Sequence, residues 1–105
     1  MTPALAVIDV SFISLRLVLP RVVELLAPNG EIVALVKPQF EVGKGKVGKG
    51  GVVRDEALQR EVVDAVRGCG ERLGLRCAGE MESPIRGPKG NREFFLHFRL
   101  GPARA

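Results

Sequence analysis

The sequence has no tryptophan or tyrosine, and it contains one histidine and two cysteines among 105 residues. A platform that stacks single-stranded bases would therefore have to use phenylalanine alone. Cys69 and Cys77 match neither the CxxC motif nor a metal-ligand spacing, so we expect two buried free thiols rather than a disulfide. The histidine, His97, has no serine or cysteine partner at a recognisable spacing, and we predict a structural role for it.

Long apolar runs are also absent. No run approaches the roughly 18 residues that a membrane-spanning helix needs, because Asp9, Arg16 and Arg21 interrupt the best candidate. The first residues include no basic region and no small-residue cleavage site, so we expect no signal peptide, no membrane partner and a cytoplasmic location. The 16 lysines and arginines outnumber the 12 acidic residues, and the net charge of +4 is compatible with a polyanionic partner.

The apolar residues predict a single mixed α/β domain. Four strands are expected, at residues 4–8, 32–36, 75–81 and 92–100. Helices joining the first three strands make them parallel, with right-handed crossovers, whereas the last strand follows a loop and should be antiparallel.

Two helices are expected between these strands. Ser11 and Ser14 are both possible N-caps for the first helix. Pro20 predicts a helical turn before it and a regular helix that begins near it. Asp55 is expected to cap the second helix, which should extend to about Gly74.

The segment 31–41, EIVALVKPQFE, places a cation at the end of a buried strand. Pro38 stops any regular continuation of that strand directly after Lys37. Ligands of open α/β sheets bind beyond the carboxyl ends of the strands, so Lys37 is a candidate for chemistry. From position alone, a lysine that extends to water along an apolar surface is equally compatible.

Two loops carry further cations. The glycine-rich segment 41–54 contains Lys44, Lys46 and Lys49 but lacks the P-loop spacing. The Pro/Gly-rich segment 82–91 carries Arg86 and Lys89. These loops could contact phosphates or could simply be solvated.

Three segments together carry a family resemblance. Residues 9–15 (DVSFISL), 35–41 (LVKPQFE) and 83–93 (SPIRGPKGNRE) resemble the TlyA/hemolysin A proteins, which belong to the FtsJ-like S-adenosylmethionine-dependent methyltransferases. The intervening GKGKVGKGGVVRDE is also similar to the middle loop of that family. The resemblance covers residues 5–100, and three linked motifs in the right order are more specific than any one of them.

The resemblance implies a Rossmann-like sheet in which this chain supplies strands in the order 4-5-7-6, with two helices and the last strand antiparallel. It implies ribose 2′-O-methylation of ribosomal RNA with S-adenosylmethionine. Loss of the hydroxyl proton would be assisted by a lysine base, oriented by carboxylates. The implied catalytic residues are Asp9, Lys37 and Glu93; the implied cofactor residues are Asp9, Val10 and Ser11; the implied RNA-binding residues are Lys44, Lys46, Lys49, Arg86 and Lys89.

Other parts of the family pattern do not occur in these 105 residues: its glycine-rich cofactor loop, its acidic ribose ligand and its first catalytic lysine. We therefore interpret residues 1–105 as the C-terminal half of an FtsJ-like methyltransferase domain without its cofactor-binding half or RNA-binding module, and expect it to be inactive alone. The alternative is a non-catalytic module that binds RNA or protein. In either case strand 4–8 becomes an apolar edge, through which we expect self-association.

Overall fold

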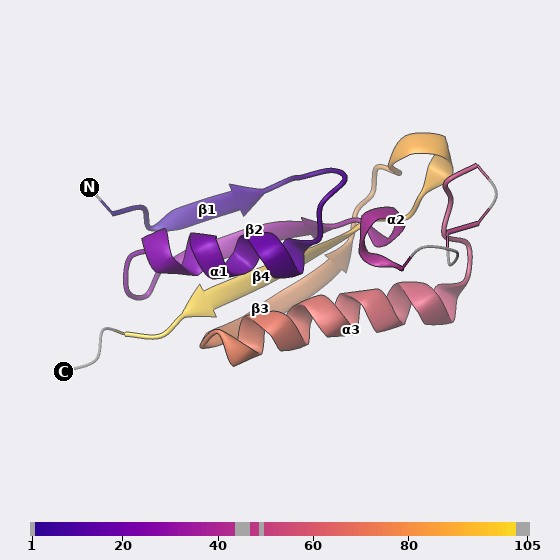
Figure 1. The fold of residues 1–105 in the computed structure, drawn as a ribbon. Helices are drawn as coiled ribbons and strands as arrows, with labels where there is room; N and C mark the ends of the chain where they lie inside the picture. Colours follow the sequence, from indigo (N-terminus) through magenta and orange to yellow (C-terminus); the bar gives the residue numbers. More distant parts are fainter. Residues whose placement is uncertain (1, 44–46, 49, 103–105) are drawn as a thin grey trace.

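A four-stranded sheet, covered by helices on one face, forms the fold (Figure 1). The computed structural model describes residues 2–43, 47–48 and 50–102. The elements are β1 (Leu5–Ile8), α1 (Leu15–Leu25), β2 (Glu31–Val36), α2 (Pro38–Glu41), α3 (Glu56–Arg72), β3 (Leu75–Glu82), the 3-10 turn η1 (Pro88–Gly90) and β4 (Phe94–Leu100).

The strand order is β1-β2-β4-β3, with β1 parallel to β2 and β4 antiparallel to both β2 and β3. This confirms the expected order 4-5-7-6 and the reversed last strand. The loops before α3 and before β4 lie at the same end of the sheet as the carboxyl ends of β1 and β2 (Figure 1).

The core lies between the sheet and the two long helices. Alternate residues of β2 point toward the helices, and Ile32, Ala34 and Val36 are completely buried. On β4, Phe98 is completely buried in the same layer. The other buried residues of this core come from both long helices and the remaining strands: Ile8, Leu15, Leu19, Leu26, Val62, Val63, Val66, Leu75 and Leu96.

Helix α1 begins at Leu15 and is continuous through Pro20, so the prediction that the regular helix begins near Pro20 is wrong. Ser14 is the N-cap, and its hydroxyl accepts a hydrogen bond from the Arg16 amide. Leu15 and Leu19 are buried in the core, which holds the first turns in place. Proline removes one backbone donor, and burial of this apolar face outweighs that loss.

The short helix α2, directly after β2, was not predicted. Pro38 occupies its first turn, where a missing N–H costs nothing. The second predicted helix is confirmed as α3, and Asp55 caps it by accepting hydrogen bonds from the Ala57 and Leu58 amides. Gln59 in its first turn is buried and donates to the Val53 carbonyl oxygen.

The two cysteines are free, as predicted, but both are half-buried rather than buried. His97 lies on β4 with Nε2 at 2.7 Å from Glu31 Oε1, a cross-strand contact consistent with its predicted structural role. No helix in the described part of the chain is long and apolar enough to cross a membrane.

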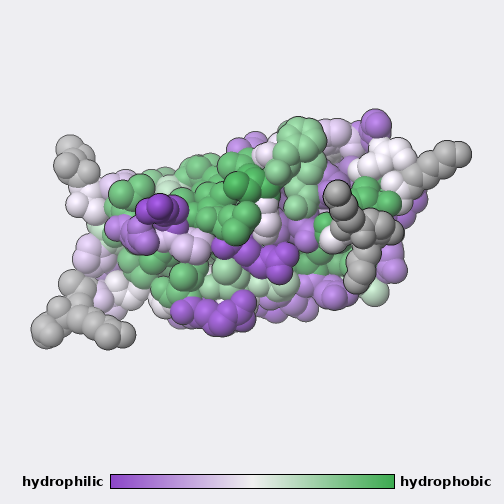
Figure 2. Space-filling view, viewed as in Figure 1, coloured by the Kyte–Doolittle hydropathy of each residue, from purple (hydrophilic) through white to green (hydrophobic). Residues whose placement is uncertain are grey.

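Strand β1 is at an edge of the sheet, and Leu5 and Val7 on it are 57% and 71% exposed. Apolar atoms also gather on the visible face where α1 lies (Figure 2), and Leu17 and Leu25 of that helix are exposed. The edge position matches the sequence-based expectation for residues 4–8.

Candidate active site

Lys37 lies at the centre of a polar cluster beyond the carboxyl ends of β1 and β2. Its Nζ is 2.5 Å from Asp9 Oδ1 and 3.1 Å from Ser11 Oγ. The Lys37 side chain is only 13% exposed, whereas that of Asp9 is 61% exposed. The predicted pairing of Lys37 with Asp9 is therefore present, and Lys37 does not simply extend into water.

The strand register explains this pairing. Ile8 of β1 is opposite Ala34 of β2 in the parallel ladder, so Asp9 leaves the sheet beside the end of β2. Lys37 follows the last residue of β2, and Pro38 turns the chain into α2 at that point. Both side chains therefore emerge at the edge where α/β sheets bind ligands.

A lysine ammonium group has three N–H donors. Asp9 and Ser11 use two of them. Within the described residues, no further hydrogen-bond or ion-pair partner of Lys37 Nζ is present, so one donor remains for a ligand.

Glu93 is placed differently from the expectation. It lies immediately before β4, is 6% exposed, and accepts a hydrogen bond from Gln39 Nε2 at 2.8 Å. The antiparallel register pairs Val36 with Phe94, so Lys37 and Glu93 leave neighbouring strands at the same level. In the part of the chain that is described, however, no ion pair within 4 Å joins them.

Arg92 fixes the backbone just before Glu93. Its guanidinium donates to both carboxylate oxygens of Glu82 and to Glu56. The hydrogen bond from Arg92 holds the pKa of the Glu82 carboxyl below its ordinary value, and the pKa of Arg92 is raised in return. These contacts hold the start of β4 against β3 and α3.

Glu41, at the end of α2, caps α1 from a distance. Its carboxylate accepts hydrogen bonds from the Ser14 hydroxyl at 2.6 Å and from the Leu15 amide at 2.8 Å. A negative charge at a helix N-terminus is favourable. Residues 37–41 are thus bonded to residues 9–15 at both ends, through Lys37 and through Glu41.

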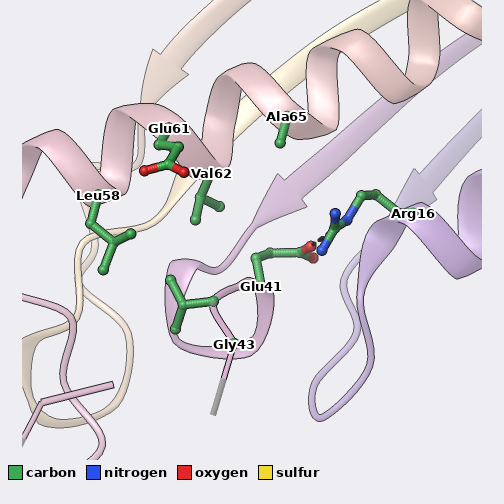
Figure 3. A pocket seen from close by; sticks show the side chains of 8 residues that line it. Arg16, Glu41, Gly43, Leu58, Glu61, Val62 and Ala65 are labelled. Atoms are coloured by element: carbon green, nitrogen blue, oxygen red, sulfur yellow. Dashed lines mark ion pairs between the residues drawn. The ribbon is translucent and has the colours of Figure 1, made fainter. Parts of the chain in front are cut away.

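A small pocket of about 130 Å³ lies beside Glu41, between α3 and the start of α1 (Figure 3). Arg16 reaches toward Glu41 at its rim, with Nε 4.0 Å from Oε1, and α3 supplies Leu58, Glu61 and Val62. None of the predicted catalytic residues lines this pocket.

The two basic loops are joined by Asn91, which is 2% exposed. Its Oδ1 accepts from the Val53 amide, and its Nδ2 donates to the carbonyl oxygens of Gly51 and Pro88. Of the predicted RNA-binding cations, Arg86 and Lys89 are exposed on the second loop. Lys44, Lys46 and Lys49 lie outside the described residues.

Phe12 is a residue at this site that the sequence reasoning missed. Its side chain is 89% exposed, and its ring centroid is 4.7 Å from that of Phe40. Its φ of 65° is unusual for a bulky residue and costs free energy. An exposed phenylalanine held in a strained turn next to Ser11 is a candidate for contact with a flat ligand. Its place in DVSFISL was the available signal.

The candidate cofactor residues are Asp9, Val10 and Ser11, in the turn after β1. Ser11 is engaged by Lys37, whereas the Asp9 carboxylate is largely exposed and therefore accessible to a cationic ligand. Across the residues that are described, no group of three or more His, Cys, Asp or Glu side chains could hold a metal ion. The exposed Asp9 carboxylate in the turn after β1 is chemically suited to lie beside a sulfonium cation.

The fold and the polar cluster together define an α/β protein with a site at the carboxyl ends of its parallel strands. The FtsJ-like methyltransferase family matches residues 1–100, and the chain belongs to that family. The 16S/23S rRNA (cytidine-2′-O)-methyltransferase TlyA of Mycobacterium tuberculosis is 50% identical over 101 residues, which are 96% of this chain and 38% of that protein.

Two further proteins are similar to this chain. Hemolysin A of Brachyspira hyodysenteriae is 38% identical over 96 residues, 91% of this chain and 40% of that protein. The crystal structure of a candidate hemolysin from Lactococcus lactis superposes with a TM-score of 0.91 and 43% identity, covering 94% of this chain and 47% of that one. The chain thus spans less than half of each of these proteins.

Proposed function

We propose that this chain is the C-terminal, catalytic half of a cytoplasmic S-adenosylmethionine-dependent methyltransferase that modifies ribose 2′-hydroxyl groups of ribosomal RNA. The observation that carries the proposal is Lys37, little exposed and held by Asp9 and Ser11 at the carboxyl edge of two parallel strands. The family membership and the rRNA methyltransferase name of a relative support the reaction and the substrate class.

In the proposed reaction, the ribose 2′-oxygen forms a bond to a methyl carbon while the bond between sulfur and that carbon breaks. S-adenosylmethionine would supply the electrophilic methyl group, and Asp9, Val10 and Ser11 would hold one side of it. Lys37, as a neutral amine, would take the proton of the 2′-hydroxyl on Nζ as the bond between oxygen and methyl carbon forms, while Asp9 and Ser11 orient that amine.

Glu93 is the third proposed catalytic residue. Glu93 leaves the sheet at the level of Lys37, and its carboxylate would orient the ribose from the side of β4. Phe12 would stack on an RNA base beside the site. The five loop cations, Lys44, Lys46, Lys49, Arg86 and Lys89, would contact phosphates.

Methyl transfer from labelled S-adenosylmethionine to ribosomal RNA tests this proposal. The native chain is assayed alone and together with the separately produced N-terminal part of the M. tuberculosis relative. We expect transfer to ribose 2′-oxygens in the second arm, and none without that part. Lys37→Ala should reduce the rate on the order of a hundredfold or more, whereas Arg21→Ala, which removes an 83% exposed cation of α1, should not change it.

If neither arm transfers methyl groups while the native chain binds RNA, the catalytic proposal is wrong and the chain is a non-catalytic RNA-binding module. That alternative has its own test, which is the dependence of RNA affinity on salt. Arg86→Ala with Lys89→Ala should weaken binding and reduce the salt slope by about one per lost phosphate contact.

We also propose that the chain alone self-associates through β1, whose outer edge has no partner strand in the described sheet. Exposed apolar edge strands pair readily with another chain. Sedimentation equilibrium should show a concentration-dependent dimer that Val7→Lys abolishes, because Val7 is 71% exposed on this strand. A native chain that is monomeric at high concentration contradicts the idea.

A further inference from the structure

The side chain of Gln39 is buried, yet only half of its carboxamide is used. Gln39 is 9% exposed, and its Nε2 donates to Glu93 Oε2 at 2.8 Å. Its Oε1 is buried and has no hydrogen-bond partner among the described residues. A buried acceptor without a donor costs stability, so a glutamine at this position needs another explanation.

Glu93 is equally unusual. It is 6% exposed, and no ion pair within 4 Å reaches its carboxylate from the described residues. The backbone at Gly87 packs so tightly against this carboxylate that a Cβ there would overlap its Oε2 and Cδ atoms. The described side-chain donor to Glu93 is a neutral amide. Burial of a carboxylate with only such a donor costs stability, so this arrangement does not serve the stability of the fold.

The location of the pair provides that explanation. Gln39 is in the first turn of α2, two residues after Lys37, and Glu93 immediately precedes β4. Lys37 is itself fixed by Asp9. The Gln39 amide is therefore the side-chain link between the turn that carries the lysine and the glutamate on the neighbouring strand.

We propose that Gln39 is a positioning residue, which holds the Glu93 carboxylate in one orientation beside Lys37. This inference rests on the methyl transfer proposed above. The hydrogen bond from Nε2 limits rotation of the carboxylate, and the Gly87 backbone packs against the same carboxylate. The pair fixes the geometry of the site at some cost to the stability of the fold.

The first test measures thermal unfolding of the chain itself, with Gln39→Met, Glu93→Met and the double variant. Methionine is unbranched and close in length to both side chains. Each single change leaves one buried polar partner unpaired and should lower the unfolding midpoint. The double change removes both polar groups, and its midpoint should equal or exceed that of the native chain. A double variant that is less stable than both single variants overturns the proposal, because the pair would then be a structural one.

The second test separates positioning from folding. In the assay arm that transfers methyl groups, Gln39→Met should lower kcat at least about tenfold and change the KM for RNA by less than about twofold. The matched control is Gln59→Met, since Gln59 is another buried glutamine, 3% exposed, whose Nε2 donates to a backbone carbonyl. It should lose stability but keep kcat. Equal kcat in the native chain and Gln39→Met overturns the proposal.

A third measurement keeps this inference distinct from the proposed function. If no arm transfers methyl groups, the proposed function is wrong. The hydrogen bond between Gln39 and Glu93 is then tested in the chain alone by ¹³C NMR of the glutamate carboxyl carbons. The Glu93 signal is assigned from its loss in Glu93→Met. Gln39→Met should shift and broaden this signal, whereas Gln59→Met should not. A Glu93 signal that is the same with and without the Gln39 amide shows that Gln39 does not orient the carboxylate.

Discussion

Two glycines of α3, two residues apart, meet opposite surroundings, and their replacement by alanine should have opposite effects. A Cβ at Gly70 would lie 2.6 Å from Cε1 and 2.8 Å from Cζ of Phe98, a completely buried ring in the core. A Cβ at Gly68 would meet only Arg72 Nη1, at 3.4 Å, which is the end of a flexible side chain. Gly68→Ala is therefore a matched control for Gly70→Ala.

The magnitudes follow from two opposing effects. Alanine is favoured over glycine within a helix by about 1 kcal/mol. Overpacking of a dense core costs about 1–3 kcal/mol, and the Phe98 ring is completely buried in that core. Gly68→Ala should therefore stabilise the chain by about 0.5–1 kcal/mol, whereas Gly70→Ala should destabilise it by about 1 kcal/mol on balance, with a range from near zero to about 2 kcal/mol.

Chemical denaturation and thermal unfolding measure both effects, and 1 kcal/mol corresponds to a midpoint shift of about 4–8 °C for a domain of this size. Phe98→Leu should relieve the contact, so the loss caused by Gly70→Ala should be smaller in that background than in the native one. If Gly70→Ala stabilises the chain as much as Gly68→Ala does, the packing of α3 on β4 described above is wrong.

Three further predictions concern a surface ion pair, the exposed ring and the loop contact. The hydrogen bond from Arg60 holds the pKa of Glu80 below its ordinary value of 4.5. This pair therefore contributes stability above pH 4.5, and the contribution is lost as the pH falls through the folded-state pKa. Glu80→Gln should flatten this acid dependence of the unfolding free energy, measured with urea. Phe12→Ala should weaken RNA binding with little change in unfolding midpoint, since the side chain is 89% exposed; filter binding and thermal unfolding check the two expectations. Asn91→Ala should cost about 1–3 kcal/mol in urea unfolding, because it leaves the buried Val53 amide without this acceptor and removes the side-chain hydrogen bonds to the Gly51 and Pro88 carbonyl oxygens.

The strands and their relative directions could be predicted from the apolar runs and the connections between them, whereas the order of the strands in the sheet was implied by the family resemblance. The course of α1 could not be predicted. Pro20 argues locally for a break, and the burial of Leu15 and the distant cap from Glu41 are tertiary contacts that local propensity does not contain. The short α2 was missed for a similar reason, since four residues have no detectable period.

The candidate site was predicted in part. Lys37 and Asp9 end neighbouring strands, so their pairing follows from topology alone. The contact of Glu93 with Gln39 does not follow from the topology, because Gln39 lies in the short helix α2, which the sequence did not predict. Phe12 was quoted only as part of a motif, and its exposure depends on a positive φ that no residue preference for phenylalanine would predict.

Polar groups that lack a described hydrogen-bond partner lie near the carboxyl ends of β1 and β2. Within the described residues, Lys37 keeps one N–H without a partner and Gln39 has a buried acceptor without a donor, and Phe12 is exposed in the turn that contains Ser11. The free edge of β1 leads directly to Asp9 in the same region. A strand added along β1 in the parallel direction would end next to Asp9, where sheet-bound ligands lie. A partner strand that pairs with β1 in this direction should therefore change the surroundings of Lys37.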